Sequence, residues 1–228
     1  MTADIAENVA RAKENIALAA KRAGRAAEDI YLVGATKMND ASRVREAICA
    51  GLPICGENRV QEILEKYGKA DVVFHMIGHL QTNKVKYIAD KVACIQSVDS
   101  VRLMDEIERQ CAKRNIVMTI FFEINAGREP DKTGVFPENL PELLAHLPAC
   151  PHLKFDGIMA MVPNAPAENN LEYYLQMKSL YDKLKGEYGI TTLSMGMSND
   201  YAEAAKCGAN MIRVGTALFG PRRTIAKE

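Results

Sequence analysis

The sequence predicts an α/β fold, a single (β/α)8 barrel preceded by one extra N-terminal helix. Eight short apolar runs lack polar alternation, as expected for parallel strands that are covered on both faces. Segments with helical periodicity separate these runs, and the regular alternation favours one parallel sheet. No Pro/Gly/Ser-rich linker divides the 228 residues, so we expect a single domain over 1–228. An open doubly wound sheet is the alternative.

The first half of the chain supplies the extra helix and four strand–helix units. Residues 5–23 carry one apolar stripe at helical spacing, and Gly24 ends it. Strands are expected at 30–37, 52–55, 72–77 and 92–95. Helices are expected from Asp40 to Gly51, up to Gly68, around Val85 and Ile88 as a short element, and from Asp99 onward.

The second half continues the same alternation. Strands are expected at 117–124, 153–161, 190–195 and 210–214, with helices from about Pro137, a long one through 177–188, and one over 198–207. The fifth strand is followed by the polar stretch NAGREPDKTG, which includes residues 128–132. A loop of this length is expected to have a function, which the sequence does not specify.

Composition excludes several classes of function. Lys+Arg and Asp+Glu both number 29, so a net charge of +0 argues against a nucleic-acid or membrane-surface partner. The longest apolar run, 116–122, is too short to span a bilayer. The N-terminus has no signal-peptide pattern, and the six cysteines form no CxxC pair. We therefore expect a cytoplasmic monomer with reduced thiols, no membrane span and no metal.

Lys37 is the first candidate for chemistry. It ends the first predicted strand, and barrels carry their active sites at the carboxyl ends of the strands. Partial desolvation there lowers the pKa of a lysine toward the neutral amine, which can attack an aldehyde. The alternative is that Lys37 only extends its ammonium group to solvent.

A phosphate site is predicted after the last two strands. Each is followed by a predicted helix N-terminus, where free N–H groups favour anions. Ser198 and Thr216 supply hydroxyls, Gly215 permits close backbone approach, and Arg213 lies within the last strand. The alternative is that Ser198 only caps a helix and Gly215 only forms a turn.

Two further clusters of residues give weaker evidence for a binding site. Asn58 follows the second strand and could hydrogen-bond a planar ligand, whereas Glu57 is read as an acid at a helix start. His75 and His79 are four residues apart, but a strand and a loop separate them and the HExxH glutamate is missing, which argues against metal binding.

A strand-end lysine facing a phosphate site suits an aldehyde that carries a phosphate. Pyridoxal 5′-phosphate and a phosphosugar bound by a Schiff-base aldolase both fit, and these residues do not separate them.

Seven motifs along the chain resemble the pyridoxal phosphate homeostasis protein family, which is similar to the barrel domain of alanine racemase. They are LVGATK, GENRVQE, HMIGHLQTNK, INAGREPDKTGV, GIMAMVP, LSMGMSNDYAEA and IRVGTALFG. The resemblance implies that Lys37 forms a Schiff base with pyridoxal 5′-phosphate (PLP) and that Ser198, Gly215 and Thr216 hold its phosphate. It also implies that Arg213 faces the pyridine nitrogen and that Asn58 flanks the ring.

Several departures from the racemase argue against efficient turnover. The tyrosine that serves as its second base comes from a C-terminal domain that we do not expect here. Met161 stands where the racemase has a histidine. Thr36 stands where a serine is expected, a mild change that keeps the hydroxyl. We therefore expect a protein of intracellular PLP (vitamin B6) homeostasis and of amino-acid and keto-acid balance, with apo-PLP enzymes as its recipients. The alternative is a PLP-dependent amino-acid racemase or lyase.

Overall fold

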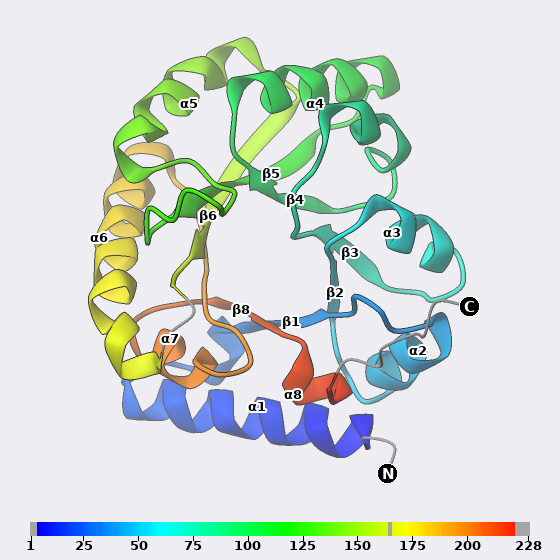
Figure 1. Ribbon diagram of the computed structural model, residues 1–228, viewed down its shortest axis with the longest axis vertical. Helices are drawn as coiled ribbons and strands as arrows, with labels where there is room; N and C mark the ends of the chain where they lie inside the picture. Colours follow the sequence, from blue (N-terminus) through cyan, green and yellow to red (C-terminus); the bar gives the residue numbers. More distant parts are fainter. Residues whose placement is uncertain (1–3, 164–165, 222–228) are drawn as a thin grey trace.

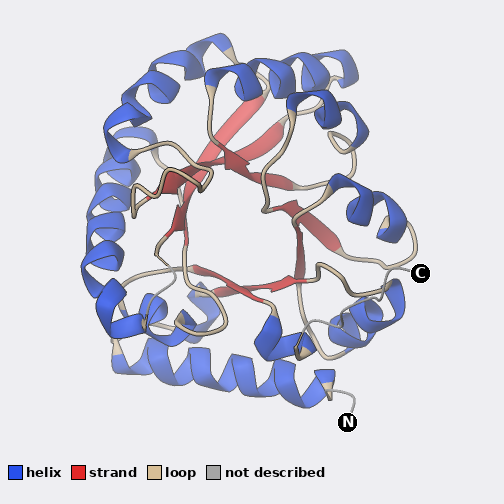
Figure 2. Ribbon diagram, in the orientation of Figure 1, coloured by secondary structure: helices blue, strands red, loops and turns tan. Residues whose placement is uncertain are grey.

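The protein folds as a closed barrel of eight parallel strands surrounded by helices (Figures 1 and 2). The computed structural model describes residues 4–163 and 166–221. The strands are arranged in chain order, and β1 (Tyr31–Ala35) pairs with both β2 (Ile54–Glu57) and β8 (Met211–Val214). The pairing of first and last strands closes the sheet. It confirms the predicted (β/α)8 barrel and excludes the open sheet.

The remaining elements alternate as the sequence predicts. The other strands are β3 (Val73–Met76), β4 (Cys94–Val98), β5 (Met118–Asn125), β6 (Leu153–Met161) and β7 (Thr192–Ser194). The helices are α1 (Ile5–Arg22), α2 (Ala41–Cys49), α3 (Val60–Lys66), α4 (Val101–Arg114), α5 (Leu140–His146), α6 (Leu171–Tyr188), α7 (Tyr201–Lys206) and α8 (Thr216–Phe219). Short 3-10 helices are η1 (Ala27–Asp29), η2 (Thr82–Tyr87), η3 (Pro137–Asn139), η4 (Leu147–Ala149) and η5 (Ala167–Asn170).

Several predicted boundaries were wrong by a few residues. The helix predicted around Val85 is the 3-10 helix η2, and the helix expected from Asp99 is capped by Ser100. The second strand extends to Glu57 and the fourth to Val98, because buried polar side chains continue both strands beyond their apolar cores. The first strand ends at Ala35, before Lys37.

The extra N-terminal helix α1 completes the outer layer of the barrel. The Asp4 carboxylate caps it by accepting a hydrogen bond from the Glu7 N–H group at 2.9 Å. Its buried stripe includes Ile5, Val9 and Ile16. Figure 1 shows α1 lying beside the short helices α7 and α8, which cover little of the sheet by themselves. The extra helix therefore fills the sector that α8, at four residues, leaves uncovered.

The core has two parts. The larger part lies between the strands and the helices, and a smaller cluster of Val33, Cys94, Phe121 and Met211 fills the barrel interior. Alternate residues of each strand point inward, so the strands contribute to both parts. We expect Phe121→Ala to cost about 3–5 kcal/mol, since it would leave a cavity in a closed interior.

The long loop after β5 is held in place by Asn125. The Asn125 side-chain amide donates to the carbonyl oxygens of Glu129 and Lys132 at 2.8 and 3.2 Å, and its Oδ1 accepts from the Glu129 N–H group at 3.1 Å. Arg128 lies in the left-handed region at φ 51° and forms an ion pair with Glu138. The loop is thus a fixed part of the barrel face.

Two chain-wide expectations concern membranes and thiols. Among the helices of residues 4–163 and 166–221, none is long and apolar enough to cross a membrane. All six cysteines are free thiols; Cys49 is exposed, Cys207 is half-buried and the other four are buried.

Candidate functional site

The six residues predicted for the site all line one cavity at the carboxyl ends of the strands. This cavity has a volume of about 400 Å³. Its lining comprises the six predicted residues, Lys37, Asn58, Ser198, Arg213, Gly215 and Thr216, together with Ala35, Ile77, Met161, Pro163, Met197, Asn199 and Asp200. A volume of this size is typical of pockets for small ligands.

Lys37 also borders a second hollow of about 460 Å³, toward α2 and α3. Gly215 and Thr216 line both hollows, and Arg43 and Arg59 line only the second. The Lys37 side chain is half-buried between them. The second hollow also has acidic residues in its lining, so its charge is mixed, and Lys37 borders both hollows.

A buried hydrogen-bond cluster fixes the backbone on both sides of Lys37. The ammonium group of Lys66 donates to the carbonyl oxygen of Thr36 at 2.9 Å and to the Glu57 carboxylate at 2.6 Å. The Thr36 hydroxyl donates to the same Glu57 oxygen at 2.5 Å. Thr36, Glu57 and Lys66 are nearly inaccessible to solvent. The residue before Lys37 is therefore held through its side chain and its carbonyl group.

The residue after Lys37 is held by the same cluster. Glu62 forms an ion pair with Lys66 at 3.2 Å and accepts a hydrogen bond from the Met38 N–H group at 2.7 Å. Met38 has φ 60°, a left-handed conformation that is unfavourable for a residue other than glycine. The contacts of Thr36 and Met38 impose this turn, which directs the chain out of β1 at Lys37.

Glu57 does not have the place that the sequence suggested. It is the last residue of β2 and is fully buried, instead of being an acid at a helix start. Burial raises the pKa of Glu57 to about 7, although the charge and hydrogen bond of Lys66 and the hydrogen bond of Thr36 oppose that rise. Its role is to anchor Lys66 and Thr36 beneath Lys37.

Ser198 connects the two loops that were predicted to bind phosphate. Its hydroxyl oxygen accepts hydrogen bonds from the N–H groups of Gly215 at 3.1 Å and Ala217 at 3.4 Å, at the start of α8. The helix expected to start at Ser198 begins instead at Tyr201, so Ser198 does not cap it. Ser198, Gly215 and Thr216 thus form one polar corner of the cavity.

Arg213 projects from β8 to the floor of the cavity and is only 5% exposed. Its guanidinium donates to the Ser194 hydroxyl at 2.8 Å and to the carbonyl oxygen of Ala160 at 3.2 Å. It also lies 3.7 Å from the sulfur of Met161. Burial lowers the pKa of Arg213 to about 10, partly offset by Glu123 and Asp200, so the group is a cation at neutral pH.

A chain of polar side chains continues from Arg213 through the barrel interior. The Ser194 hydroxyl donates to Gln96 Oε1 at 2.8 Å, and Gln96 Nε2 lies 2.8 Å from His75 Nδ1. Gln96 and Ser194 are fully buried, and His75 is 7% exposed. Burial lowers the pKa of His75 to about 4, so its ring is neutral at pH 7. The chain fixes the orientation of Arg213 without adding a second charge.

Asn58 presents an unsatisfied acceptor to the cavity. Its Oδ1 atom is buried and has no hydrogen-bond partner among the described residues. Gly78 packs directly on the same residue, since a Cβ atom at position 78 would lie 2.6 Å from the Asn58 carbonyl oxygen. An amide oxygen held in this way suits a ligand that donates a hydrogen bond.

The two histidines considered for metal binding have different partners. His75 is directed into the barrel toward Gln96, whereas the half-exposed His79 lies 3.6 Å from Asp99. Within the residues that the structure describes, the group of side chains that could hold a metal ion does not include either of them.

Sequence reasoning missed Glu62, Lys66 and Asp200. The spacing of Glu62 and Lys66 at i and i+4 is the available signal, but this pattern is also common on exposed helix surfaces. Asp200 lines the cavity and accepts hydrogen bonds from the Tyr174 hydroxyl at 2.6 Å and the Met197 N–H group at 2.5 Å. It anchors the loop that carries Ser198.

Comparison with known proteins places this geometry in a family. The family described as "Alanine racemase, N-terminal domain" matches residues 8–223. A curated relative, the "Pyridoxal phosphate homeostasis protein" of Aquifex aeolicus, is 42% identical over 223 residues, which are 95% of this chain and 98% of the relative.

Solved structures show the same barrel. The PipY protein of Synechococcus elongatus, with PLP bound, has a TM-score of 0.80 at 30% identity, covering 95% of this chain and all of that one. An alanine racemase of Clostridium difficile, at 17% identity and a TM-score of 0.72, shares the fold; 96% of this chain matches 57% of the racemase. The chain therefore belongs to the pyridoxal phosphate homeostasis protein family, built on the barrel of the alanine racemase N-terminal domain.

Proposed function

We propose that this protein binds pyridoxal 5′-phosphate as a Schiff base on Lys37 and serves intracellular vitamin B6 homeostasis without efficient catalysis. Residues 1–228 act as one cofactor-binding domain. The observation that carries the proposal is the single cavity in which Lys37 meets Ser198, Gly215, Thr216 and the buried Arg213. The name of the Aquifex relative and the PLP in the PipY structure support it.

The cavity residues suit each part of this cofactor. Lys37 supplies the amine for the aldehyde, and Ser198 and Thr216 supply hydroxyl groups for the phosphate, beside the Gly215 N–H group that donates to Ser198. Asn58 offers its unpaired acceptor beside the ring. When bound, PLP supplies an electrophilic carbon and a ring that can accept electrons.

Arg213 provides the argument against efficient catalysis. A guanidinium group can only donate hydrogen bonds, and Arg213 stays protonated at neutral pH because its pKa is about 10. Facing the pyridine nitrogen, Arg213 would keep that nitrogen unprotonated. Withdrawal of electrons by the ring is then weak, and the carbanion chemistry of a racemase or lyase is disfavoured. Met161, next to Arg213, cannot hold or donate a proton as a histidine can.

The wider role follows from binding without efficient turnover. We propose that the protein stores PLP and passes it to apo-PLP enzymes, in the cytoplasm and as a monomer, which affects amino-acid and keto-acid balance. A store of this kind protects a reactive aldehyde until a recipient needs it. The second hollow beside Lys37, lined by Arg43 and Arg59, gives a recipient or an incoming amine access to that side.

The test is reconstitution followed by visible spectroscopy. Cofactor-free protein mixed with PLP should take up one equivalent and turn yellow, and borohydride should bleach the colour, whereas Lys37→Ala should show neither change. Protein that remains colourless and takes up no PLP contradicts the proposal and favours the phosphosugar alternative.

Turnover is tested on the same preparation. A panel of amino acids should give no racemisation or elimination above that of free PLP. Turnover that requires Lys37 would instead support the racemase or lyase alternative.

A further inference from the structure

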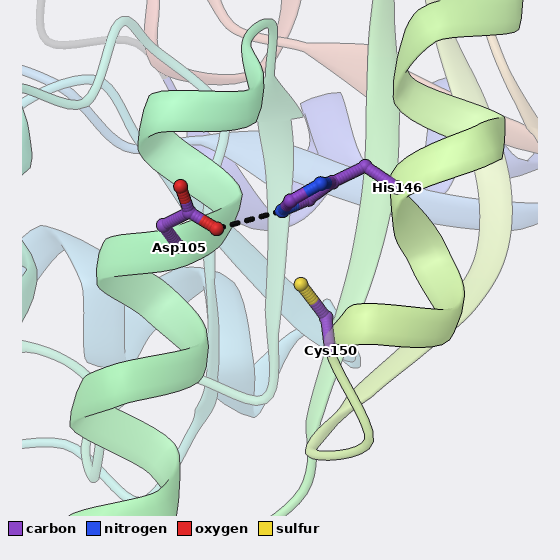
Figure 3. A group of neighbouring side chains, drawn as sticks. All are labelled: Asp105, His146 and Cys150. Atoms are coloured by element: carbon purple, nitrogen blue, oxygen red, sulfur yellow. Dashed lines mark hydrogen bonds and ion pairs between the residues drawn. The ribbon is translucent and has the colours of Figure 1, made fainter.

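A second group of reactive side chains lies outside the barrel, between α4 and the segment that follows α5. Asp105 projects from α4, His146 is the last residue of α5, and Cys150 follows the 3-10 helix η4 (Figure 3). One carboxylate oxygen, one ring nitrogen and the thiol sulfur all lie within 4.8 Å of one another. In Figure 3 the sulfur points toward the gap between the carboxylate and the ring.

The surroundings of this group also resemble a ligand site. His152 Nδ1 lies 2.6 Å from the Glu108 carboxylate, which also accepts from the His152 N–H group at 2.8 Å. Glu108 lies one turn along α4 from Asp105, and both carboxylates act electrostatically on the Cys150 thiol. The Glu108 oxygens are held by His152, and the negative charges of Glu108 and Asp105 favour a cation near Cys150.

The Asp105, His146 and Cys150 side chains differ in their exposure to solvent. Cys150 is buried, the His146 side chain is 28% exposed and the Asp105 side chain is 61% exposed. The group therefore opens to solvent on one side. Three protein ligands with one open position is a common arrangement around zinc, and the open position holds water.

We propose that Asp105, His146 and Cys150 form a surface site for a divalent transition metal of the zinc type. The set of one sulfur, one nitrogen and one oxygen donor suits Zn²⁺ and does not suit Mg²⁺ or Ca²⁺, which prefer oxygen ligands. On binding, the S–H bond of Cys150 breaks, its proton leaves to the buffer, and a metal–sulfur bond forms; no oxidant or reductant is required.

The geometry needs only a small adjustment. Zinc bonds of roughly 2.0–2.3 Å place tetrahedral donors roughly 3.3–3.7 Å apart. The hydrogen-bonded oxygen and nitrogen of Asp105 and His146, now 2.7 Å apart, must separate slightly while the sulfur approaches. The exposed Asp105 side chain can make this change by rotation about its own bonds. Sequence spacing could not reveal the whole site, because Asp105 lies on α4, far along the chain from His146 and Cys150.

The test uses Co²⁺ as a spectroscopic probe on untagged protein that has been treated with chelator and freed of PLP. The parent should bind one equivalent of Co²⁺ and develop a near-ultraviolet thiolate-to-cobalt band, which Zn²⁺ then abolishes by displacement. Cys150→Ser should lose the band, whereas Cys49→Ser, a change at an exposed cysteine of α2, should keep it.

A second variant keeps the test decisive if Cys150→Ser does not fold. His146→Gln changes a partly exposed side chain and should lower Co²⁺ affinity by about 10-fold or more. If the parent protein shows no thiolate-to-cobalt band at saturating Co²⁺, the proposal is overturned. An unchanged band and affinity in both variants would do so as well. The site lies on outer helices and does not involve the Lys37 cavity, so its failure leaves the proposed function untouched.

Discussion

Stability at mildly acid pH should depend on His75, the inner end of the polar chain that orients Arg213. Burial lowers the pKa of His75 from 6.5 to about 4, so the unfolded chain binds a proton at this ring more strongly than the folded chain does. The contribution of His75 is therefore complete above pH 6.5 and is lost as the pH falls toward 4. Linkage gives a loss of about 2 kcal/mol in the free energy of unfolding between about pH 7.5 and about pH 5.

The assay compares urea unfolding of the parent and of His75→Asn at these two pH values. Asparagine keeps an oxygen near the position of Nδ1 that can accept from Gln96 Nε2, but it does not titrate. The parent should lose about 2 kcal/mol more than the variant on acidification, because all other titrating groups are common to both proteins. Equal losses in the two proteins would refute the assignment of a neutral, buried His75.

Three further predictions concern the cavity. Lys66→Met leaves the buried Glu57 without its ion-pair partner, so it should cost about 3–5 kcal/mol in urea unfolding and slow borohydride trapping of PLP. Lys66→Arg should restore part of both, and full stability in Lys66→Met would contradict this role. Ser198→Ala and Thr216→Val should each weaken PLP retention by about 10-fold, the value of one hydrogen bond to a charged group, with circular dichroism unchanged; unchanged retention in both would remove the phosphate site. Arg213→Ala should shift the visible absorption maximum of bound PLP, and a spectrum identical to that of the parent would mean that Arg213 does not face the ring.

The barrel could be predicted from the sequence because its signals are local. Each strand is a short apolar run, and Gly24, Gly51, Gly68 and Gly208 have positive φ angles at the ends of the helices that they were expected to close. Boundaries were wrong where a buried polar residue continues a strand, as at Glu57. The predicted helix start at Ser198 was also wrong. The Ser198 hydroxyl accepts a hydrogen bond from the Gly215 N–H group at the start of α8, and Asp200 is the N-cap residue of α7.

The candidate site could be predicted where residues stand at strand ends or in the loops that directly follow them. Lys37, Asn58 and Arg213 fit that rule, and all three line the cavity. Lys66 lies within a helix, so its hydrogen bond to the Thr36 carbonyl group depends on how α3 packs against β1 and β2. The chain from His75 to Arg213 joins four different strands, and no spacing in the sequence encodes such a contact.

The most direct test of the central claim is peptide mass spectrometry after PLP-loaded protein has been reduced with borohydride and digested. The account predicts that the reduced cofactor is attached to the peptide containing Lys37, at one group per chain. Attachment to another lysine, such as Lys66 in the wall of the second hollow, or the absence of any attached cofactor would contradict it.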